Sequence, residues 1–257
     1  MSQLAYIHSG ATIGKDSVIE PFASIYDDVV IGDNCWIGPN AVIMPGTRIG
    51  NNCRVFPGAV IGAVPQDLKY NGEYTTTEIG NNVTIRECVT INKGTTDKMK
   101  TSVGDNCLLM AYVHVAHDCQ IGNNCIIANS VNIAGHVEIG DYAILEGTVA
   151  VQQFVVIGAH CFIAGASLVR KDVPPFVKAA KEPLCYAGVN AIGLKRRNFS
   201  DNDIRHIEDI YRILYVQNNN VSKALSIVKT ELPQSKFTEM ITSFVSSSEK
   251  GVIKGMI

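Results

Sequence analysis

Residues 115–140 read VAHDCQIGNNCIIANSVNIAGHVEIG, and every sixth position of this stretch, counted from Val115, is aliphatic. The same register runs from Ile7 to Val169, where 25 of its 28 positions hold Ile, Val or Leu. A period of six fits neither an α-helix nor an ordinary amphipathic strand, and it is typical of a hexapeptide β-helix. The sequence therefore predicts an all-β solenoid over most of its length.

Three hexapeptides close one triangular coil of such a solenoid, with each aliphatic side chain pointing into the prism. Residues 18 apart then become neighbours on adjacent coils, about 4.8 Å apart. Glycine often follows the aliphatic residue, as in Ile31-Gly32 and Ile121-Gly122, and we expect it to relieve backbone strain at the corners. The repeat resembles that of left-handed parallel β-helices, so this is the handedness expected.

Three polar residues, Asp67, Glu73 and Asp97, interrupt the register. They predict two loops, residues 62–78 and 92–102, that project from the prism. Loops on a rigid scaffold often carry function.

The repeat ends at Pro174-Pro175, because proline bars regular strand pairing. The expected domains are a left-handed parallel β-helix over residues 1–173 and a C-terminal helical domain over residues 174–257. In this tail, Ser200 has the position of an N-cap with Asp203 three residues later. Two further helices are expected over residues 223–232 and 237–246.

Composition narrows the class of protein. The 22 Lys and Arg against 24 Asp and Glu leave a net charge of −2, which argues against a nucleic-acid footprint spread over the surface. No apolar run approaches the ~20 residues of a membrane-spanning helix, so a cytoplasmic protein without a membrane span is expected. Six of the eight cysteines stand four places after an aliphatic residue, which predicts small, buried, free thiols rather than zinc ligands or disulfides.

Candidate catalytic residues gather on two successive coils. His117 and Asp118 lie on one coil, and His136 lies on the next. Adding 18 to His117 gives Gly135, and adding 18 again gives Gln153. One column thus offers an imidazole, a flexible backbone amide and a side-chain amide, which suit a base, an oxyanion donor and a positioning group for acyl transfer.

Two other interpretations fit the same histidines. A single histidine at a solenoid corner is usually a solvated surface residue. His114, His117 and His136 also number enough for a zinc site, although a pair spaced H-x2-H with a third histidine on another coil is weak evidence for one.

Five short strings carry a resemblance to a known family. They are PQDLKY (65–70), HVAHDC (114–119), AGHV (134–137), GVN (188–190) and GLKRR (193–197). Over essentially its whole length the chain resembles the acyl-carrier-protein–UDP-N-acetylglucosamine O-acyltransferases, hexapeptide-repeat enzymes that open lipid A biosynthesis in Gram-negative bacteria.

This resemblance implies transfer of a long-chain (R)-3-hydroxyacyl group from acyl carrier protein to the 3-hydroxyl of UDP-N-acetylglucosamine. It implies no cofactor of the enzyme's own, because the acyl donor is carried on the phosphopantetheine of the carrier protein. It also implies a homotrimer with its sites between subunits.

The roles of individual residues follow from the same resemblance. His117 is expected to be the general base, Asp118 to orient it, and the Gly135 amide to stabilise the oxyanion. The expected substrate-binding residues are Asp67 and Lys69 from the first loop, His114, His136, Gln153 and Asn190 in the sugar and acyl groove, and Arg196 and Arg197 against nucleotide phosphate or carrier protein.

Gly165 matches the position of the family's acyl-length ruler, and a bare glycine there implies a groove for a long chain. Gln152 and Asn92 stand where many members have histidine, so the finer donor and nucleotide contacts stay open. The carrier protein of this family is acidic, and we expect Lys178, Lys181 and Lys195, with Arg196 and Arg197, to form a basic patch that meets it.

Two related proteins are alternatives. The N-acyltransferase of the same pathway normally has a further N-terminal domain, whereas the repeat here begins at residue 7, which counts against it. A γ-class carbonic anhydrase uses the same prism with interfacial zinc.

Overall fold

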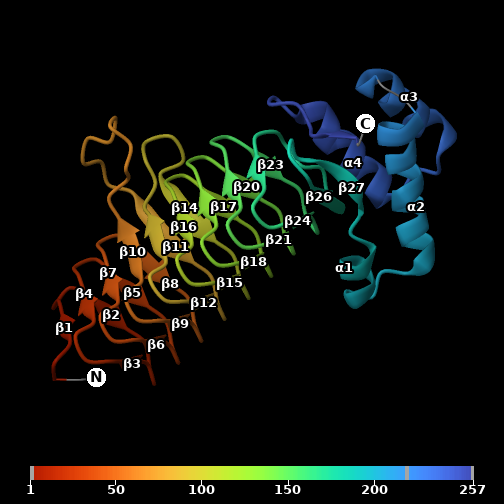
Figure 1. Cartoon of the computed structure of the whole chain (residues 1–257). Coiled ribbons are helices and arrows are strands. Elements are labelled where there is room, and N and C mark those ends of the chain that lie inside the picture. The colour runs from red at the N-terminus through yellow and green to blue at the C-terminus, as the bar shows by residue number, and fades with distance from the viewer. Residues whose placement is uncertain (1–2, 218–219, 256–257) are drawn as a thin grey trace.

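The computed structural model describes residues 3–217 and 220–255, and it shows a long three-sided prism that ends in helices (Figure 1). Most strands are two residues long, and successive strands pass from one side of the prism to the next. Each prism strand pairs in parallel with the strand one coil away, as His114 does with Asn132 and Val115 with Ile133. The β-solenoid predicted from the six-residue period is confirmed.

The three sides of the prism are called sheets A, B and C. Sheet A has nine strands, in spatial order β1 (Tyr6–Ile7), β4 (Ser24–Ile25), β7 (Val42–Ile43), β10 (Val60–Ala63), β13 (Thr90–Asn92), β16 (His114–Val115), β19 (Asn132–Ile133), β22 (Ala150–Val151) and β25 (Leu168–Val169). Sheet B has eight, β2 (Thr12–Ile13), β5 (Val30–Ile31), β8 (Thr47–Ile49), β11 (Thr76–Ile79), β14 (Lys100–Val103), β17 (Gln120–Ile121), β20 (Glu138–Ile139) and β23 (Val156–Ile157). Sheet C has eleven, β3 (Val18–Ile19), β6 (Trp36–Ile37), β9 (Arg54–Val55), β12 (Thr84–Ile85), β15 (Leu108–Leu109), β18 (Ile126–Ile127), β21 (Ile144–Leu145), β24 (Phe162–Ile163), β26 (Val177–Ala180), β27 (Cys185–Val189) and β28 (Lys254–Gly255).

The chain turns from sheet A to sheet B at the A/B corner, and the B/C and C/A corners follow in the same way. The aliphatic residue of each hexapeptide faces the interior, where Ile25, Ile61 and Ile133 have no exposed surface. The six repeat cysteines are buried and free, as predicted from their spacing. The core is therefore a continuous column of aliphatic and thiol side chains.

The corners are built differently from the prediction. The residue three places after the aliphatic one adopts a positive φ, as in Asn34 (56°) and Asn124 (57°). The glycine directly after the aliphatic residue does not, except for Gly62 (82°) next to the first loop. A Cβ on Gly32 would lie 2.8 Å from the carbonyl carbon of Gly50, one coil away. Glycine is needed there because neighbouring coils stack backbone against backbone, so the expected relief of corner strain is wrong.

Both loops project from the A/B corner (Figure 1). The first covers residues 64–75 and the second residues 93–99, so the ranges predicted from the sequence also take in the ends of the flanking strands. The loops lengthen their coils. Val60 pairs with Thr90, 30 residues on, and Thr90 pairs with His114, 24 residues on.

The C-terminal part contains α1 (Ala191–Arg196), α2 (Asp201–Arg212), a π-helical turn η1 (Ile213–Gln217), α3 (Val221–Glu231) and α4 (Lys236–Ser247). Ser200 and Asp203 form the predicted capping box at the start of α2. Helix α1 was not expected. None of the helices in the described residues combines the length and apolar character that a membrane crossing requires.

The predicted C-terminal helices are confirmed, but this region also contains strands that the sequence did not predict, because sheet C continues past the two prolines. Strand β26 pairs in parallel with β24, β27 lies antiparallel to β26, and β28 pairs in parallel with β27. Pro174 and Pro175 occupy a corner just before β26, where no amide is needed for strand pairing.

Close coil stacking predicts a large effect of a single methyl group. Gly104→Ala would place its Cβ 2.8 Å from the carbonyl carbon of Gly122, whereas the Cβ of Gly147→Ala would meet its nearest neighbour at an ordinary 3.5 Å. We expect Gly104→Ala to lower the free energy of unfolding by about 1–3 kcal/mol, as overpacking does. Denaturant unfolding of both variants tests this, and equal stabilities would contradict it.

Candidate active site

Coil stacking forms one column of residues along the A/B corner. His117, Gly135 and Gln153 each stand two places after an inward aliphatic residue, and these aliphatic residues pair coil to coil. Because the second loop lengthens its coil, the residue one coil before His117 is Lys93, 24 positions earlier. The spacing of 18 used on the sequence missed this lysine. Burial lowers the pKa of Lys93, and the charge of Asp28 opposes that shift.

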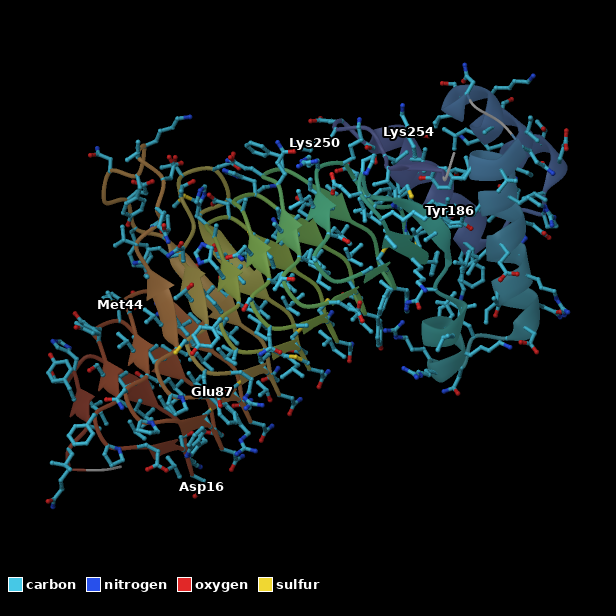
Figure 2. The ribbon with its side chains drawn as sticks, viewed as in Figure 1. Asp16, Met44, Glu87, Tyr186, Lys250 and Lys254 are labelled. Atoms are coloured by element: carbon cyan, nitrogen blue, oxygen red, sulfur yellow. The ribbon has the colours of Figure 1, made fainter. Side chains whose placement is uncertain are left out.

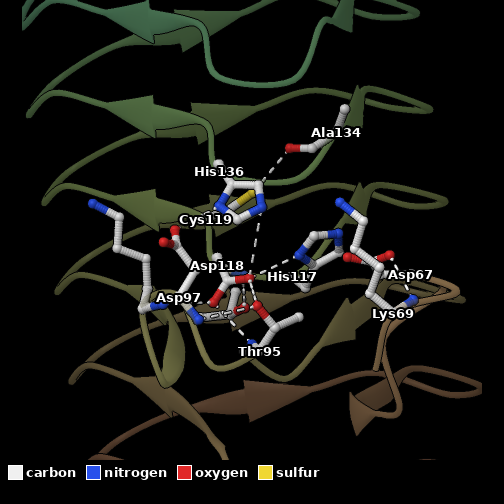
Figure 3. Close-up of polar contacts among 12 residues, drawn as sticks. Asp67, Lys69, Thr95, Asp97, His117, Asp118, Cys119, Ala134 and His136 are labelled. Carbon is white, nitrogen blue, oxygen red and sulfur yellow. Dashed lines mark hydrogen bonds and ion pairs between the residues drawn. The ribbon is translucent and has the colours of Figure 1, made fainter. Parts of the chain in front are cut away.

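His117 and Asp118 form a hydrogen-bonded pair at this corner (Figure 3). The His117 Nδ1 lies 2.8 Å from Asp118 Oδ2, and the side chains of the two residues are 10 % and 0 % exposed. A carboxylate that is hydrogen-bonded to Nδ1 favours the tautomer with a proton on that nitrogen. Nε2 then keeps its lone pair. The pair therefore has the arrangement of an oriented general base.

The second loop holds Asp118 in place. Thr95 donates to the carboxylate from its backbone N–H at 2.8 Å and from its hydroxyl at 2.6 Å, and the Lys98 N–H donates at 3.2 Å. Burial alone would raise the pKa of Asp118, but hydrogen bonds from Thr95 and His117 bring it below its ordinary value. Asp118 is thus an ionised carboxylate fixed by several donors. After Lys93, Thr95 is the second residue of this site that the sequence did not suggest.

Gly135 lies directly against the His117 ring. A Cβ on residue 135 would come within 2.6 Å of His117 Cε1 and 2.7 Å of Nε2, so only glycine leaves room for the imidazole. Among the described residues, none supplies an acceptor for the Gly135 N–H. At the B/C corner the equivalent amides of Asp105 and Asn123 donate to an Asn or Asp side chain one coil on. The amide beside Nε2 is available to a ligand.

His136 forms the other wall of the site. Its Nδ1 lies 2.9 Å from Asp97 Oδ2, and its ring is stacked on Phe154 with the ring centroids 4.5 Å apart. The His117 and His136 rings meet edge to face at 5.0 Å. Asp97 and Asp118 flank the two imidazoles, so the second loop touches both histidine-bearing coils.

His114 does not join this cluster. Its Nδ1 bonds the Thr90 hydroxyl at 2.7 Å, and burial lowers its pKa. Within the described residues the group that could offer three ligand atoms to a metal is His117, Asp118 and His136, with those atoms within 4.8 Å of one another. The set of three histidines considered for zinc is therefore not formed.

A hollow of about 280 Å³ opens beside His136 and is lined by residues of both loops, including Asp67, Lys69 and Asp97. Figure 3 shows Asp67 and Lys69 on the His117 side of the cluster and Asp97 on the opposite side. The Lys69 N–H donates to Asp67 Oδ1 at 3.0 Å. The first loop thus brings the two residues predicted from the sequence to the site.

Four expected residues lie elsewhere in the same chain. Asn190 caps α1 and donates to the His160 carbonyl at 2.9 Å. Arg197 donates to the Tyr142 carbonyl at 3.0 Å, which places it at the B/C corner, and Arg196 is exposed on α1. Gly165 follows β24 and so lies at the C/A corner.

The expected basic patch is also divided. Lys178 is on β26, and Lys181 follows this strand. Lys195 belongs to α1, where it pairs with Asp201 at 3.1 Å. The lysines therefore fall into two groups on different parts of the C-terminal region.

Comparison with known proteins identifies the family of this chain. A family model described as UDP N-acetylglucosamine O-acyltransferase, domain 2, matches residues 172–253, and the bacterial transferase hexapeptide model matches residues 10–35, 28–63 and 100–135. The acyl-[acyl-carrier-protein]–UDP-N-acetylglucosamine O-acyltransferase of Chlorobaculum parvum is 55% identical over 248 residues, which cover 96% of this chain and 94% of the relative. This chain belongs to the UDP-N-acetylglucosamine O-acyltransferase family. The Aquifex aeolicus protein of the same name is 60% identical over 195 residues, covering 76% of this chain and 75% of the relative.

Solved structures of the family share the whole fold. A UDP-N-acetylglucosamine acyltransferase from Bacteroides fragilis superposes with a TM-score of 0.97 at 50% identity and covers 99% of this chain and 100% of that one. The left-handed β-helix and the hexapeptide acyltransferase family predicted from the sequence are confirmed. The comparisons support neither the N-acyltransferase nor the carbonic anhydrase.

The contact between Gly135 and His117 gives a direct test of the site. Gly135→Ala forces the imidazole away from its position, because the new Cβ would overlap Cε1. We expect turnover to fall by at least about tenfold, since small displacements of catalytic groups are costly. Turnover and thermal stability of the variant would be measured together. Near-normal turnover would show that the His117 ring is not confined by residue 135.

Proposed function

We propose that this protein transfers a long-chain (R)-3-hydroxyacyl group from acyl carrier protein to the 3-hydroxyl of UDP-N-acetylglucosamine, the first step of lipid A biosynthesis. The observation that carries this proposal is the His117–Asp118 pair with the Gly135 amide beside Nε2. A base and an amide donor within one site are what acyl transfer to a hydroxyl requires.

The reaction follows from this arrangement. His117 Nε2 takes the proton of the sugar 3-hydroxyl as its oxygen attacks the thioester carbonyl, and the Gly135 N–H donates to the carbonyl oxygen as it becomes negative. The C–S bond then breaks, and the thiolate of the carrier arm takes the proton back from His117. Asp118 stabilises the imidazolium in between, because its carboxylate stays ionised and hydrogen-bonded.

The first loop is the proposed place of the nucleotide sugar. Asp67 offers a carboxylate to sugar hydroxyls and Lys69 a cation to the pyrophosphate, and both line the hollow that ends at His136. His114, His136 and Gln153 are proposed to line the same groove. Phosphopantetheine arrives with the donor, so the chain itself supplies no cofactor. A cytoplasmic location stays a prediction.

A homotrimer with shared sites explains the four residues found away from the A/B corner. Asn190, Arg196, Arg197 and Gly165 lie at other edges of the prism, so they would reach the substrates from a neighbouring copy. Sedimentation of the purified protein tests the trimer.

The activity itself is tested by incubating the protein with UDP-N-acetylglucosamine and a panel of 3-hydroxyacyl carrier proteins and weighing the product. We expect a monoacylated nucleotide sugar whose ester is on the 3-oxygen. No mass increase with any donor would reject the proposal.

Removal of the proposed general base, His117, is expected to slow turnover. His117→Ala should reduce turnover by about 10²–10⁴-fold while KM values and thermal stability change little, as removal of a general base does. Steady-state kinetics with both substrates give the answer. A variant with wild-type turnover would remove His117 from the mechanism.

Gly165 is proposed to limit acyl length. A Cβ there would meet the Gly147 carbonyl oxygen at 3.3 Å and the Glu146 side chain at 3.7 Å, so a larger side chain must extend outward over the surface. Each methylene that Gly165→Met denies burial costs about 0.8 kcal/mol. We expect preference to move to donors several carbons shorter, with Gly165→Ala in between. An equal loss of activity with short and long donors would contradict the proposal that Gly165 limits acyl length.

A further inference from the structure

The first loop, residues 64–75, is attached to the prism at both ends. At its start, the Asn92 side-chain amide donates to the Val64 carbonyl at 3.2 Å. At its end, the buried Thr75 hydroxyl donates to the Gly94 carbonyl at 2.6 Å. Figure 2 shows the rest of the loop standing clear of the prism. The position of its tip therefore depends on how firmly the two ends are held.

The tip of the loop is ordered by hydrogen bonds of its own. Asp67 accepts from the Lys69 N–H with its side chain and from the Tyr70 N–H with its carbonyl, both at 3.0 Å. The Tyr70 hydroxyl donates to the Glu73 carbonyl at 2.9 Å. Because these bonds lie within the loop, they fix its shape but not its angle to the prism. A tilt at the ends would carry Asp67 and Lys69 away from His117 together.

A third attachment joins the end of the loop to earlier coils. The Tyr74 hydroxyl donates to Asp28 Oδ2 at 2.9 Å, across 46 residues of sequence. Arg48 donates from Nη2 to Asp28 Oδ1 at 2.6 Å and to the Tyr74 hydroxyl oxygen at 3.1 Å. The three side chains close a triangle in which each one bonds the other two. Asp28, Arg48 and Tyr74 are called the brace.

The brace lies outside the core. Tyr74 is 66% exposed, and an exposed ion pair such as that of Asp28 and Arg48 contributes little to the stability of a fold. Strand β11, which follows the loop, is held by its own pairing with β8. The distinctive effect of the brace is therefore to hold the end of the loop at one angle.

The brace also lies beside the candidate site. The charge of Asp28 acts on Lys93, which stands one coil before His117 in the column along the A/B corner. A change in the brace is thus close enough to alter how the loop meets the site, although none of its three side chains belongs to the proposed proton transfer.

We infer that Tyr74, held by Asp28 and Arg48, is a positioning residue for the nucleotide sugar. It sets the angle of the first loop and so the places of Asp67 and Lys69. A loop that is already in place binds its ligand without first being ordered, so the brace lowers KM for UDP-N-acetylglucosamine and leaves the chemical step unchanged. This inference rests on the proposed function and adds to its nucleotide-sugar side.

Tyr74→Phe tests the inference, because it removes the hydroxyl and leaves the ring. We expect KM for UDP-N-acetylglucosamine to rise about fivefold, as for the loss of one net hydrogen bond, with kcat and KM for the acyl donor within about twofold of wild type. Amide hydrogen exchange over residues 66–77, followed by mass spectrometry without substrates, should become faster. The unfolding temperature should not change. Tyr6→Phe, an exposed tyrosine on β1 at the far end of the prism, is the matched control.

Asp28→Asn provides a second arm, because it keeps the shape of the side chain and removes its charge. It should raise the same KM, and the double variant with Tyr74→Phe should be no worse than the more severe single change, since both act through one contact. The neighbouring Asp27→Asn is the control, because Asp27 is paired with His8 at 3.3 Å and lies outside the brace.

Two results would overturn the inference. One is loop exchange and KM at wild-type values in Tyr74→Phe, and the other is a fall in kcat with KM unchanged, which would assign Tyr74 to the chemical step. Absence of product with wild type and every donor would instead reject the proposed function. Loop exchange in Tyr74→Phe would still decide whether the brace holds the loop.

Discussion

Hydrogen bonding between successive coils is the constraint on which the rest of this structure depends. The Ala116 N–H donates to Ile133 and the Ala134 N–H to Val151, at 3.0 and 3.1 Å, and similar bonds run the length of the prism. A slip by one residue would turn every aliphatic side chain outward, so burial of the core fixes the register. The same register places His117 beside Gly135. The geometry of the candidate site is therefore a consequence of core packing.

The candidate catalytic side chains lie at a corner of the prism. The left-handed residue of such corners is Asn at many turns, a type that tolerates positive φ. Along the A/B corner the same position holds Asp118, His136 and Phe154, all with φ near 60°. The second loop then fixes Asp118 through Thr95, so the pair with His117 does not depend on the corner alone. A rigid scaffold supplies position, and a loop supplies the hydrogen bonds that keep the carboxylate ionised.

The sequence was sufficient to predict those parts of the molecule whose residues recur at a fixed spacing. The period of six gave the solenoid, and the step of 18 gave Gly135 from His117. Prediction from the sequence failed where the number of residues per coil varies. Lys93 was missed because the second loop makes its coil 24 residues long, and the strands after Pro175 were missed because their partners are not at a repeat distance. Thr95 lies in that loop, and Asn190 carries no signal of its contact with His160.

A crystal structure of the protein with UDP-N-acetylglucosamine and a non-hydrolysable 3-hydroxyacyl-pantetheine analogue tests the central claim most directly. We expect the sugar 3-oxygen within about 2.6–3.2 Å of His117 Nε2. The carbonyl oxygen of the analogue should lie about 2.7–3.1 Å from the Gly135 nitrogen. If both substrates bind and the 3-oxygen contacts another residue while Gly135 faces solvent, the column along the A/B corner is not the reaction centre.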